Sequence, residues 1–433
     1  MKQADYANHL NILRHELQVA LGCTEPIAIA YAGAKAREAL GRMPESCHIQ
    51  CSGNIVKNVK GVVVPNSGGL RGIEVAAVLG IVGGDAKREL AVLEGVTDED
   101  RAEVRKLLAE KFCTCELVKG VENLYIVAEV KAGGDSASVE IQGQHNNITK
   151  IVRNGKVVFE KHSDGVDSQE SEGDEEAINL RSIIEFAGSA EIKDIEPILA
   201  NQIKCNKAIS EEGLCGEWGV QAGKSLLALS QEPDVRLKAR AAAAAGSDAR
   251  MSGCPMPVVI NSGSGNQGIT VTMPVVVYSE EYGMGDELTY RALALANLAA
   301  VHQKKYIGRL SAYCGVVSAA TGAACGVAYM LMRRRGASDE EIYHVICGTI
   351  INSICTIGGM VCDGAKSSCA TKISVAVENA LLGMELASAG HVFQPGEGLT
   401  MDDAEATICA VGRMGREGMR ETDIEILNIM LGN

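Results

Sequence analysis

Apolar and polar positions follow different patterns in the two halves of the chain. From Cys47 to about Phe159, short apolar runs such as KGVVVPN, LYIVAEV and ASVEIQG succeed one another between turn residues, which is typical of strands. Helical patterns precede these runs at residues 5–20 and 27–40 and interrupt them near 71–83 and 98–111. The pattern predicts an α+β region with a largely antiparallel sheet over residues 1–162.

The second half of the chain is predicted to be mainly helical, over residues 178–433, with buried apolar helices. Helical periodicity is found at 177–210, 217–230, 234–246, 286–304, 310–335, 338–353, 370–388 and 402–417. Between the halves, residues 163–177 carry seven acidic side chains and no basic one. Such a segment cannot bury a core, so we expect a solvated linker or loop there.

One apolar segment could be taken for a membrane span. Residues Leu310 to Met332 carry no charge and precede three arginines. The segment is nevertheless rich in Gly, Ala, Ser, Thr and Cys, which favours a buried central helix of a soluble protein. We therefore expect no membrane partner.

Charge and cysteine content narrow the class of protein. The net charge is −14, which argues against nucleic acid or an anionic membrane as the main partner. There are 15 cysteines, and the polar N-terminal residues lack the apolar core of a signal peptide. Cysteines that stay reduced in the cytoplasm suggest burial, catalysis or metal binding rather than disulfides.

Cysteines at regular spacing stand out near the end of the apolar region. Cys355, Cys362 and Cys369 lie seven residues apart, so on one helix each step would climb roughly 10.5 Å at about 1.5 Å per residue. Gly358-Gly359 and Gly364 interrupt that helix, which allows Cys355 and Cys362 to approach a common point, together with Cys314 from the apolar segment. Three thiolates would leave one iron of a [4Fe-4S] cluster open to substrate. The alternative is that these cysteines are small buried core residues.

Three further stretches are candidates for binding or catalysis. Cys23 precedes a predicted helix, where the helix dipole favours a thiolate, although a packed turn cysteine fits the position equally well. The stretches 51–58 and 261–268 are predicted loops that share the tripeptide Ser-Gly-Asn. Such loops offer backbone N–H groups to a carboxylate or phosphate, although both could be ordinary turns.

Two other motifs of the chain match known patterns less well. The glycines at 263, 265 and 268, with an acid at 286, match a dinucleotide-binding pattern, but Pro274 interrupts the expected helix and no βαβ unit follows. Lys57 with the sequence SGGL at 67–70 is similar to a pyridoxal phosphate lysine and its phosphate loop. The two lie too close in sequence for that fold.

Six stretches together resemble a known family. They are GCTEP (22–26), SGNIVKN (52–58), CGEWGVQAGKS (215–225), SGSGNQGI (262–269), YCGVVSAATGAACG (313–326) and GGMVCDGAKSSC (358–369). The chain resembles the L-cysteine desulfidase family, which is similar to the alpha part of iron-sulfur-dependent L-serine dehydratases. The resemblance implies a [4Fe-4S] cluster and no pyridoxal phosphate. The chain ends in ILNIMLGN, so inhibition by a C-terminal cysteine is not expected.

The resemblance also implies roles for individual residues. The cluster ligands are Cys314, Cys355 and Cys362, with Cys369 as the alternative to Cys362 and otherwise a core residue. Cys23 and Lys57 are the catalytic candidates. The substrate-binding candidates are Thr24, Glu25, Ser52, Asn54, Asn58, Ser264, Gly265 and Asn266.

The predicted function is a β-eliminating lyase that converts L-cysteine to pyruvate, ammonia and sulfide. An L-serine dehydratase with the same mechanism is the nearest alternative, and a non-catalytic iron-sulfur or redox-sensing protein is the other. The expected partner is a small amino acid, and the large apolar helices are compatible with a homodimer.

Overall fold

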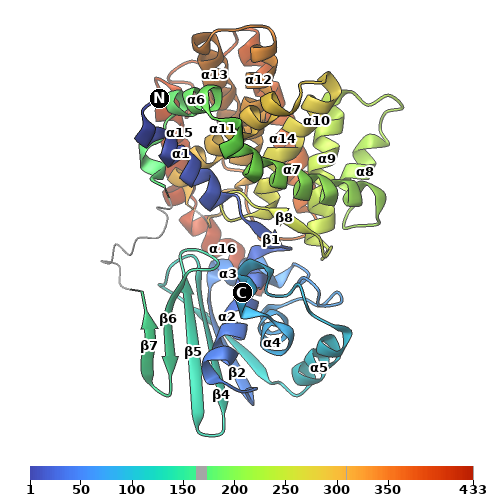
Figure 1. Ribbon diagram of the computed structural model, residues 1–433, viewed down its shortest axis with the longest axis vertical. Helices are drawn as coiled ribbons and strands as arrows, with labels where there is room; N and C mark the ends of the chain where they lie inside the picture. Colours follow the sequence, from blue (N-terminus) through green and yellow to red (C-terminus); the bar gives the residue numbers. More distant parts are fainter. Residues whose placement is uncertain (162–172, 309, 433) are drawn as a thin grey trace.

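The computed structural model describes residues 1–161, 173–308 and 310–432. A sheet with its covering helices forms one end of the molecule, and a bundle of helices forms the other (Figure 1). This arrangement confirms the predicted α+β class with a helical C-terminal region. Most of the predicted acidic linker, residues 163–172, lies outside the described residues, and the predicted domain boundaries stay a prediction.

The main sheet has six strands in the order β3-β2-β4-β5-β6-β7. Its strands are β2 (Ser46–Ser52), β3 (Cys113–Val118), β4 (Tyr125–Ala132), β5 (Asp135–Gln142), β6 (Ile148–Arg153) and β7 (Lys156–Glu160). Only β2 and β3 are parallel, so the sheet is largely antiparallel as predicted. Buried residues alternate along β4 and β5, because one face of the sheet packs on α2 (Thr24–Leu40).

Close helix packing continues this layer. α4 (Ile73–Gly83) packs on α2, and α5 (Asp98–Ala109) packs on α4. A Cβ on Gly80 would lie 2.1 Å from the carbonyl oxygen of Ala30, so the α2–α4 contact requires glycine there. The predicted strand at 60–66 is wrong: the segment pairs only at Val63 with Arg71. It forms a turn in which the Val64 amide donates to the Leu70 carbonyl.

A small second sheet joins the two ends of the molecule. β1 (Val19–Leu21) pairs antiparallel with β8 (Pro257–Val259), which lies more than 230 residues later in the chain. Before β1, α1 (Gln3–Glu16) packs on helices of the C-terminal region rather than on the main sheet (Figure 1). The first residues of the chain therefore belong spatially to the helical bundle.

The helical region contains the predicted helices and two helices that were not predicted, at 265–282 and 420–431. Its helices are α6 (Leu180–Ser189), α7 (Ile192–Cys215), α8 (Ala222–Leu227), α9 (Val235–Met251), α10 (Gly265–Tyr282), α11 (Asp286–Ile307), α12 (Val316–Arg334), α13 (Asp339–Ile357), α14 (Cys369–Ser388), α15 (Ala404–Arg413) and α16 (Arg420–Leu431). α10 was not predicted, and it contains Pro274 within a buried helix. α12 is long and apolar enough to cross a membrane, but 89% of its apolar window is buried inside the fold, as predicted for a core helix.

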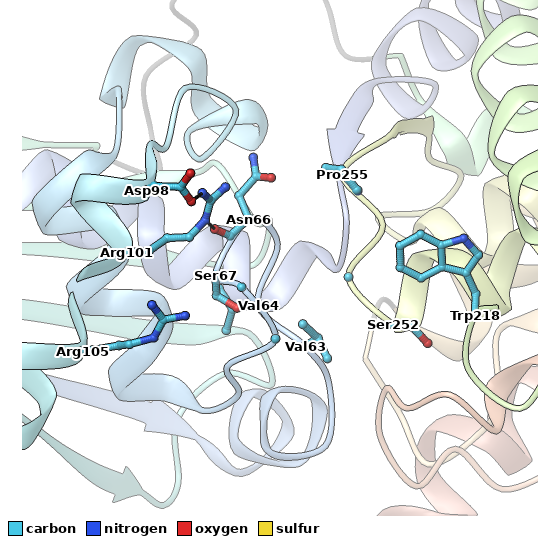
Figure 2. Close-up of a pocket in the computed structure, with 13 residues that line it drawn as sticks. Val63, Val64, Asn66, Ser67, Asp98, Arg101, Arg105, Trp218, Ser252 and Pro255 are labelled. Atoms are coloured by element: carbon cyan, nitrogen blue, oxygen red, sulfur yellow. Dashed lines mark hydrogen bonds and ion pairs between the residues drawn. The ribbon is translucent and has the colours of Figure 1, made fainter. Parts of the chain in front are cut away.

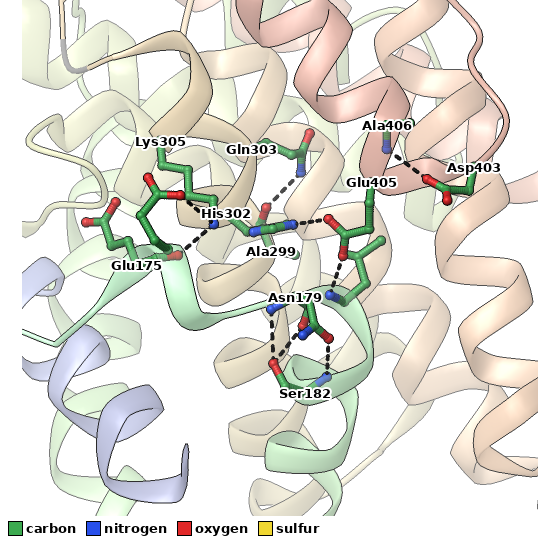
Figure 3. Close-up of polar contacts among 12 residues, drawn as sticks. Glu175, Asn179, Ser182, Ala299, His302, Gln303, Lys305, Asp403, Glu405 and Ala406 are labelled. Carbon is green, nitrogen blue, oxygen red and sulfur yellow. Dashed lines mark hydrogen bonds and ion pairs between the residues drawn. The ribbon is translucent and has the colours of Figure 1, made fainter. Parts of the chain in front are cut away.

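A polar network fastens α6 and α15 to α11 (Figure 3). Asn179 and Ser182 form a capping box at the start of α6. The Glu405 carboxylate accepts a hydrogen bond from the Leu180 amide at 2.8 Å and lies 2.6 Å from His302 Nε2. Three elements that are far apart in the chain are thus joined by one carboxylate.

Candidate functional site

A cavity of about 100 Å³ lies at the junction of the two ends of the molecule. The sheet region lines it with Cys23, Glu25, Asn58 and His145. The helical region supplies the remaining wall, which includes Arg250, Ser264, Asn266, Gln267, Lys304, Cys314, Cys362, Cys369 and Lys372. The structure therefore brings together seven of the residues predicted from the sequence.

Two cysteines on separate segments meet at this cavity. Backbone hydrogen bonds join the segments, because the Cys314 amide donates to the Met360 carbonyl at 2.8 Å and the Cys362 amide to the Ala312 carbonyl at 2.6 Å. The thiol of Cys314 donates a hydrogen bond to Cys362 and thereby lowers the pKa of Cys362 to about 5, against the effect of burial. The positive charge of Lys57 acts in the same direction. Within this pair, ionisation of Cys362 is therefore favoured over ionisation of Cys314.

The other two cysteines of this region are placed differently from expectation. Cys369, which was expected in the core, lines the cavity, with its Sγ 3.7 Å from the Gly364 carbonyl oxygen. Cys355 does not line the cavity, and its sulfur accepts a hydrogen bond from Thr400 at 3.4 Å. Cys355 is therefore not on the cavity wall, although it lies near a residue of that wall, since burial, Cys314 and Cys355 all raise the pKa of Tyr313.

The thiols of the cavity match in part the [4Fe-4S] cluster that the resemblance implies. Four thiols line the cavity, those of Cys23, Cys314, Cys362 and Cys369, and thiols are the donor type that iron-sulfur clusters use. As arranged, however, no three His, Cys, Asp or Glu side chains of the described residues stand close enough to hold a metal ion. The cavity has the chemical donors for a cluster without a preassembled ligand set.

Cys23 is the N-cap residue of α2, where a thiolate was one of the expectations. Its thiol instead donates a hydrogen bond to Glu25 Oε2 at 3.1 Å. Complete burial raises the pKa of Cys23 well above its usual range, and the negative charge of Glu25 raises it further. The helix dipole is outweighed, and Cys23 is a protonated thiol.

Glu25 is the centre of a buried polar group. Asn58 Nδ2 donates to Glu25 Oε1 at 3.0 Å, and His145 Nε2 lies 3.9 Å from the same oxygen. Burial raises the pKa of Glu25, but the polar interaction with the His145 side chain and the hydrogen bond from Cys23 outweigh burial and hold the pKa at about 2. Among the described residues, His145 Nε2 has no hydrogen-bond partner. The pair Glu25–His145 is therefore a buried carboxylate beside a buried imidazole.

The first Ser-Gly-Asn stretch is a helix start rather than a loop. Ser52 is the N-cap residue of α3 (Gly53–Lys60), and its hydroxyl donates to the Asn123 carbonyl at 2.6 Å. Ser52 and Asn54 line a neighbouring groove, not the cavity. Lys57 is buried and does not line the cavity, and its ammonium forms an ion pair with Asp423 of α16 and donates to the Cys362 carbonyl at 3.3 Å.

The second Ser-Gly-Asn stretch does reach the cavity. Ser264 and Asn266 line it at the start of α10, and Thr24 Oγ1 donates to the neighbouring Gly263 carbonyl at 3.0 Å. Gly265 has a packing role, because a Cβ there would lie 2.3 Å from Arg250 Nε. The glycine leaves room for the arginine side chain.

Comparisons with known proteins identify the family of the chain. The family model of the serine dehydratase alpha chain matches residues 87–428. The chain belongs to the serine dehydratase alpha chain family. This membership places the protein among lyase-type enzymes of amino-acid catabolism.

Full-length relatives of this serine dehydratase alpha chain-like protein are found in several bacteria. A UPF0597 protein of Lachnoclostridium phytofermentans is 46% identical over 426 residues, covering 98% of this chain and 100% of the relative. UPF0597 proteins of Finegoldia magna (46% identical, 98% and 99% covered) and Treponema denticola (41% identical, 100% and 99% covered) are similar along their whole length. The description of the matching family refers to serine.

Two residues that line the cavity of this serine dehydratase alpha chain family member, Arg250 and His145, were not predicted from the sequence. Arg250 is 2% exposed and lines the cavity, where its Nε donates to the Gly22 carbonyl at 2.9 Å. A lone arginine at the end of the alanine-rich segment 241–251 was a signal that could have identified it. His145 lies in the polar turn between β5 and β6, where GQHNN gives no signal beyond that of a turn.

Proposed function

We propose that the protein is a β-eliminating lyase that converts L-cysteine to pyruvate, ammonia and sulfide. The observation that carries the proposal is the composition of one small buried cavity. It combines a hydrogen-bonded pair of cysteine thiols, a buried arginine, and an imidazole beside an ionised carboxylate. These groups match the thiolate ligands, the carboxylate anchor and the base that an elimination from an amino acid requires.

Cys314, Cys362 and a third thiol would hold a [4Fe-4S] cluster. When bound, the cluster supplies a Lewis-acidic iron for the sulfur of the leaving group. The resemblance favours Cys355 as the third thiol, whereas position on the cavity favours Cys369. The iron content of Cys355→Ser and Cys369→Ser proteins distinguishes these two assignments, because only the ligand variant should lose bound iron.

The substrate carboxylate would bind between Arg250 and the start of α10. The guanidinium of Arg250 uses its Nε for the Gly22 carbonyl and keeps its terminal N–H groups for an anion. The amino-terminal end of the 18-residue helix α10 adds a favourable field for negative charge, beside Ser264 and Asn266. This arrangement would direct the β-substituent of the substrate toward the thiols.

His145 is the base in this proposal. Its free Nε2 would take the α-proton of the substrate, and ionised Glu25 would stabilise the imidazolium that forms. The electron pair of the C–H bond forms the new double bond while the C–S bond breaks and sulfide leaves. The resulting enamine takes a proton on carbon, and water hydrolyses the imine to pyruvate and ammonia. Cys23, as a thiol, orients Glu25 by its hydrogen bond.

L-Serine is the second candidate substrate. The family description favours it, whereas the match between a soft thiolate leaving group and iron favours cysteine. Pyridoxal phosphate is not expected, since the ammonium of Lys57 is engaged by Asp423. All 15 cysteines are free thiols in the structure, which agrees with a reducing cytoplasmic location.

The test is pyruvate formation from L-cysteine and from L-serine, measured in parallel on anaerobically purified protein before and after cluster reconstitution. We expect cluster-dependent pyruvate, with L-cysteine giving the higher kcat/KM. A higher kcat/KM with L-serine would make L-serine the assigned substrate in place of L-cysteine. Iron-loaded protein that forms no product from either amino acid would contradict the lyase and favour a sensor.

A further inference from the structure

A second cleft, of about 390 Å³, lies on another part of the junction between the two ends of the molecule (Figure 2). Arg101 and Arg105 of α5 and the loop 66–69 form one wall. Trp218 and Ser252 of the helical region lie on the opposite side. None of these residues takes part in the proposed elimination.

The arginine wall has unused hydrogen-bond donors. Arg101 donates from Nε to the Asn66 carbonyl at 2.7 Å and forms an ion pair with Asp98, which leaves other N–H groups of its guanidinium available. Arg105 has no hydrogen bond or ion pair with any residue of 1–161, 173–308 or 310–432. Asp98 is the one acidic side chain among the residues that line the cleft. The cleft is therefore locally cationic on a chain whose net charge is −14.

The loop beside these arginines offers backbone donors. Asn66, Gly68 and Gly69 have φ values of 57°, 71° and 90°. A Cβ on Gly68 would lie 3.1 Å from Arg105 Nη2, whereas a Cβ on Gly69 would face open space. The amides of both glycines donate to no residue of the described chain. Left-handed turns with free amides form concave anion sites.

The opposite wall presents an aromatic surface. Trp218 is the single tryptophan of the chain, and its Nε1 donates to Glu212 at 2.9 Å, which fixes the indole. Figure 2 shows the indole across the cleft from the two arginines. A fixed indole can stack on a planar ring.

We propose that this cleft binds a small phosphate ester that carries a planar ring, with a mononucleotide as the simplest example. The phosphate oxygens would accept from Arg101, Arg105 and the glycine amides, and the ring would lie against Trp218. A phosphate has more acceptor oxygens than a carboxylate for this number of donors. The cleft volume falls in the range of small-molecule sites.

The site would be adjacent to the catalytic cavity without being part of it. The C-terminal end of α9 supplies Arg250 to the cavity, and Ser252, two residues later, lies on the cleft. Val62 packs with Cys23 and Met251, while the next residue, Val63, lines the cleft. A ligand in the cleft would contact the backbone that also positions the cavity, which is the geometry of an effector site.

Trp218 makes the test direct, because tryptophan emission comes from this cleft alone. Adenosine 5′-monophosphate, inorganic phosphate and adenosine are titrated separately against the full-length protein, with calorimetry as the second measurement. We expect a saturable response to the nucleotide with a Kd below about 1 mM, weaker binding of phosphate, and no binding of adenosine. In Arg105→Gln the nucleotide Kd should rise by ~10- to 100-fold, the usual effect of losing a charge-assisted hydrogen bond.

The control is Lys106→Gln, which removes a charge from the same helix at a residue that pairs with Glu103 outside the cleft. It should bind as the unsubstituted protein does. Circular dichroism establishes that both variants are folded. Absence of a saturable response to nucleotide and phosphate, or equal affinity in Arg105→Gln, would overturn the proposal. Equal affinity for phosphate and for the nucleotide would exclude the stacking of the ligand ring on Trp218.

Discussion

The sheet region and the helical region supply different chemistry to the same cavity. The sheet region provides Glu25, Asn58 and His145, and in the proposed elimination His145 moves the proton beside the Glu25 carboxylate. The helical region provides Cys314 and Cys362, whose thiols are of the type that binds metals. In the proposed function, proton transfer and metal binding are therefore separated by region, and substitutions on the two sides should separate iron content from turnover.

The largest effect is expected on the thiol side. Cys314→Ala removes a proposed cluster ligand, so both bound iron and pyruvate formation should be lost. Turnover should fall by at least ~10³-fold, because Lewis-acid stabilisation is worth several kcal/mol and each 1.36 kcal/mol is tenfold in rate. Iron analysis and an anaerobic pyruvate assay measure the two quantities.

Cys113→Ala is the matched control for that prediction. Cys113 is also buried and hydrogen-bonded to another thiol, that of Cys47, but it lies on β3 away from the cavity. It should retain iron and turnover. Full iron and full activity in Cys314→Ala would show that the cluster, if present, is bound elsewhere.

On the proton-handling side, His145→Asn should give a protein that keeps its iron and loses turnover. A positioned general base contributes typically 10²- to 10⁴-fold, so we expect a fall of ~10³-fold in kcat. Asn146→Ala is the control, because its side chain is in the same turn but bonds to Glu89 at the surface, 2.8 Å away. Loss of iron in His145→Asn would break the division between the two regions.

The cavity could be predicted in part because its thiol side carries local signals. The glycines around Cys362 and the apolar helix after Cys314 are visible in the sequence, and the structure joins these segments by backbone hydrogen bonds. The ionisation of Cys23 could not be predicted, because it depends on Glu25 in the folded state and on burial. His145 was missed because its role comes from the packing of the β5–β6 turn against α2, a contact between distant parts of the chain.

The prediction of the fold is limited in the same way, because contacts between distant parts of the chain leave no local signal in the sequence. Strands of the main sheet follow from alternation along the chain, whereas the β1–β8 pair joins residues 19–21 to 257–259 and has no local signature. The helix α10 was missed because its residues are buried on all sides and Pro274 opposes helix formation locally. Tertiary packing of a buried helix overrides that local preference.

A smaller effect tests whether the helical region also binds substrate. In Arg250→Lys, the substrate KM should rise by ~10- to 100-fold with little change in kcat or iron, because a lysine cannot reproduce the planar donor set. Arg240→Lys is the control on the same helix, since Arg240 pairs with Glu378 at 3.1 Å and does not line the cavity. A fall in kcat at unchanged KM would remove Arg250 from the binding step.

The smallest expected effect is on the stability of the fold, at Glu405, which does not line the cavity. Burial raises the pKa of Glu405, but the hydrogen bond from His302 and its charge outweigh burial, so the pKa lies below its ordinary value of 4.5. A carboxyl group with a lowered folded-state pKa stabilises the fold above its unfolded-state pKa, and this contribution is lost as the pH falls through the folded-state pKa. Glu405→Gln should therefore cost about 1 kcal/mol at pH 7, and the difference should shrink below about pH 4.

Thermal unfolding of Glu405→Gln at pH 7 and at low pH measures this difference, with the exposed Glu421→Gln as the control. Because Glu405 joins α15 to α6 and α11 and contacts neither the thiols nor His145, iron content and turnover at neutral pH should not change. A stability difference that grows toward low pH would contradict the assigned sign. A loss of iron would mean that packing within the helical bundle controls the positions of Cys314 and Cys362. Metal binding at the cavity would then depend on the whole helical region and not only on the residues that line the cavity.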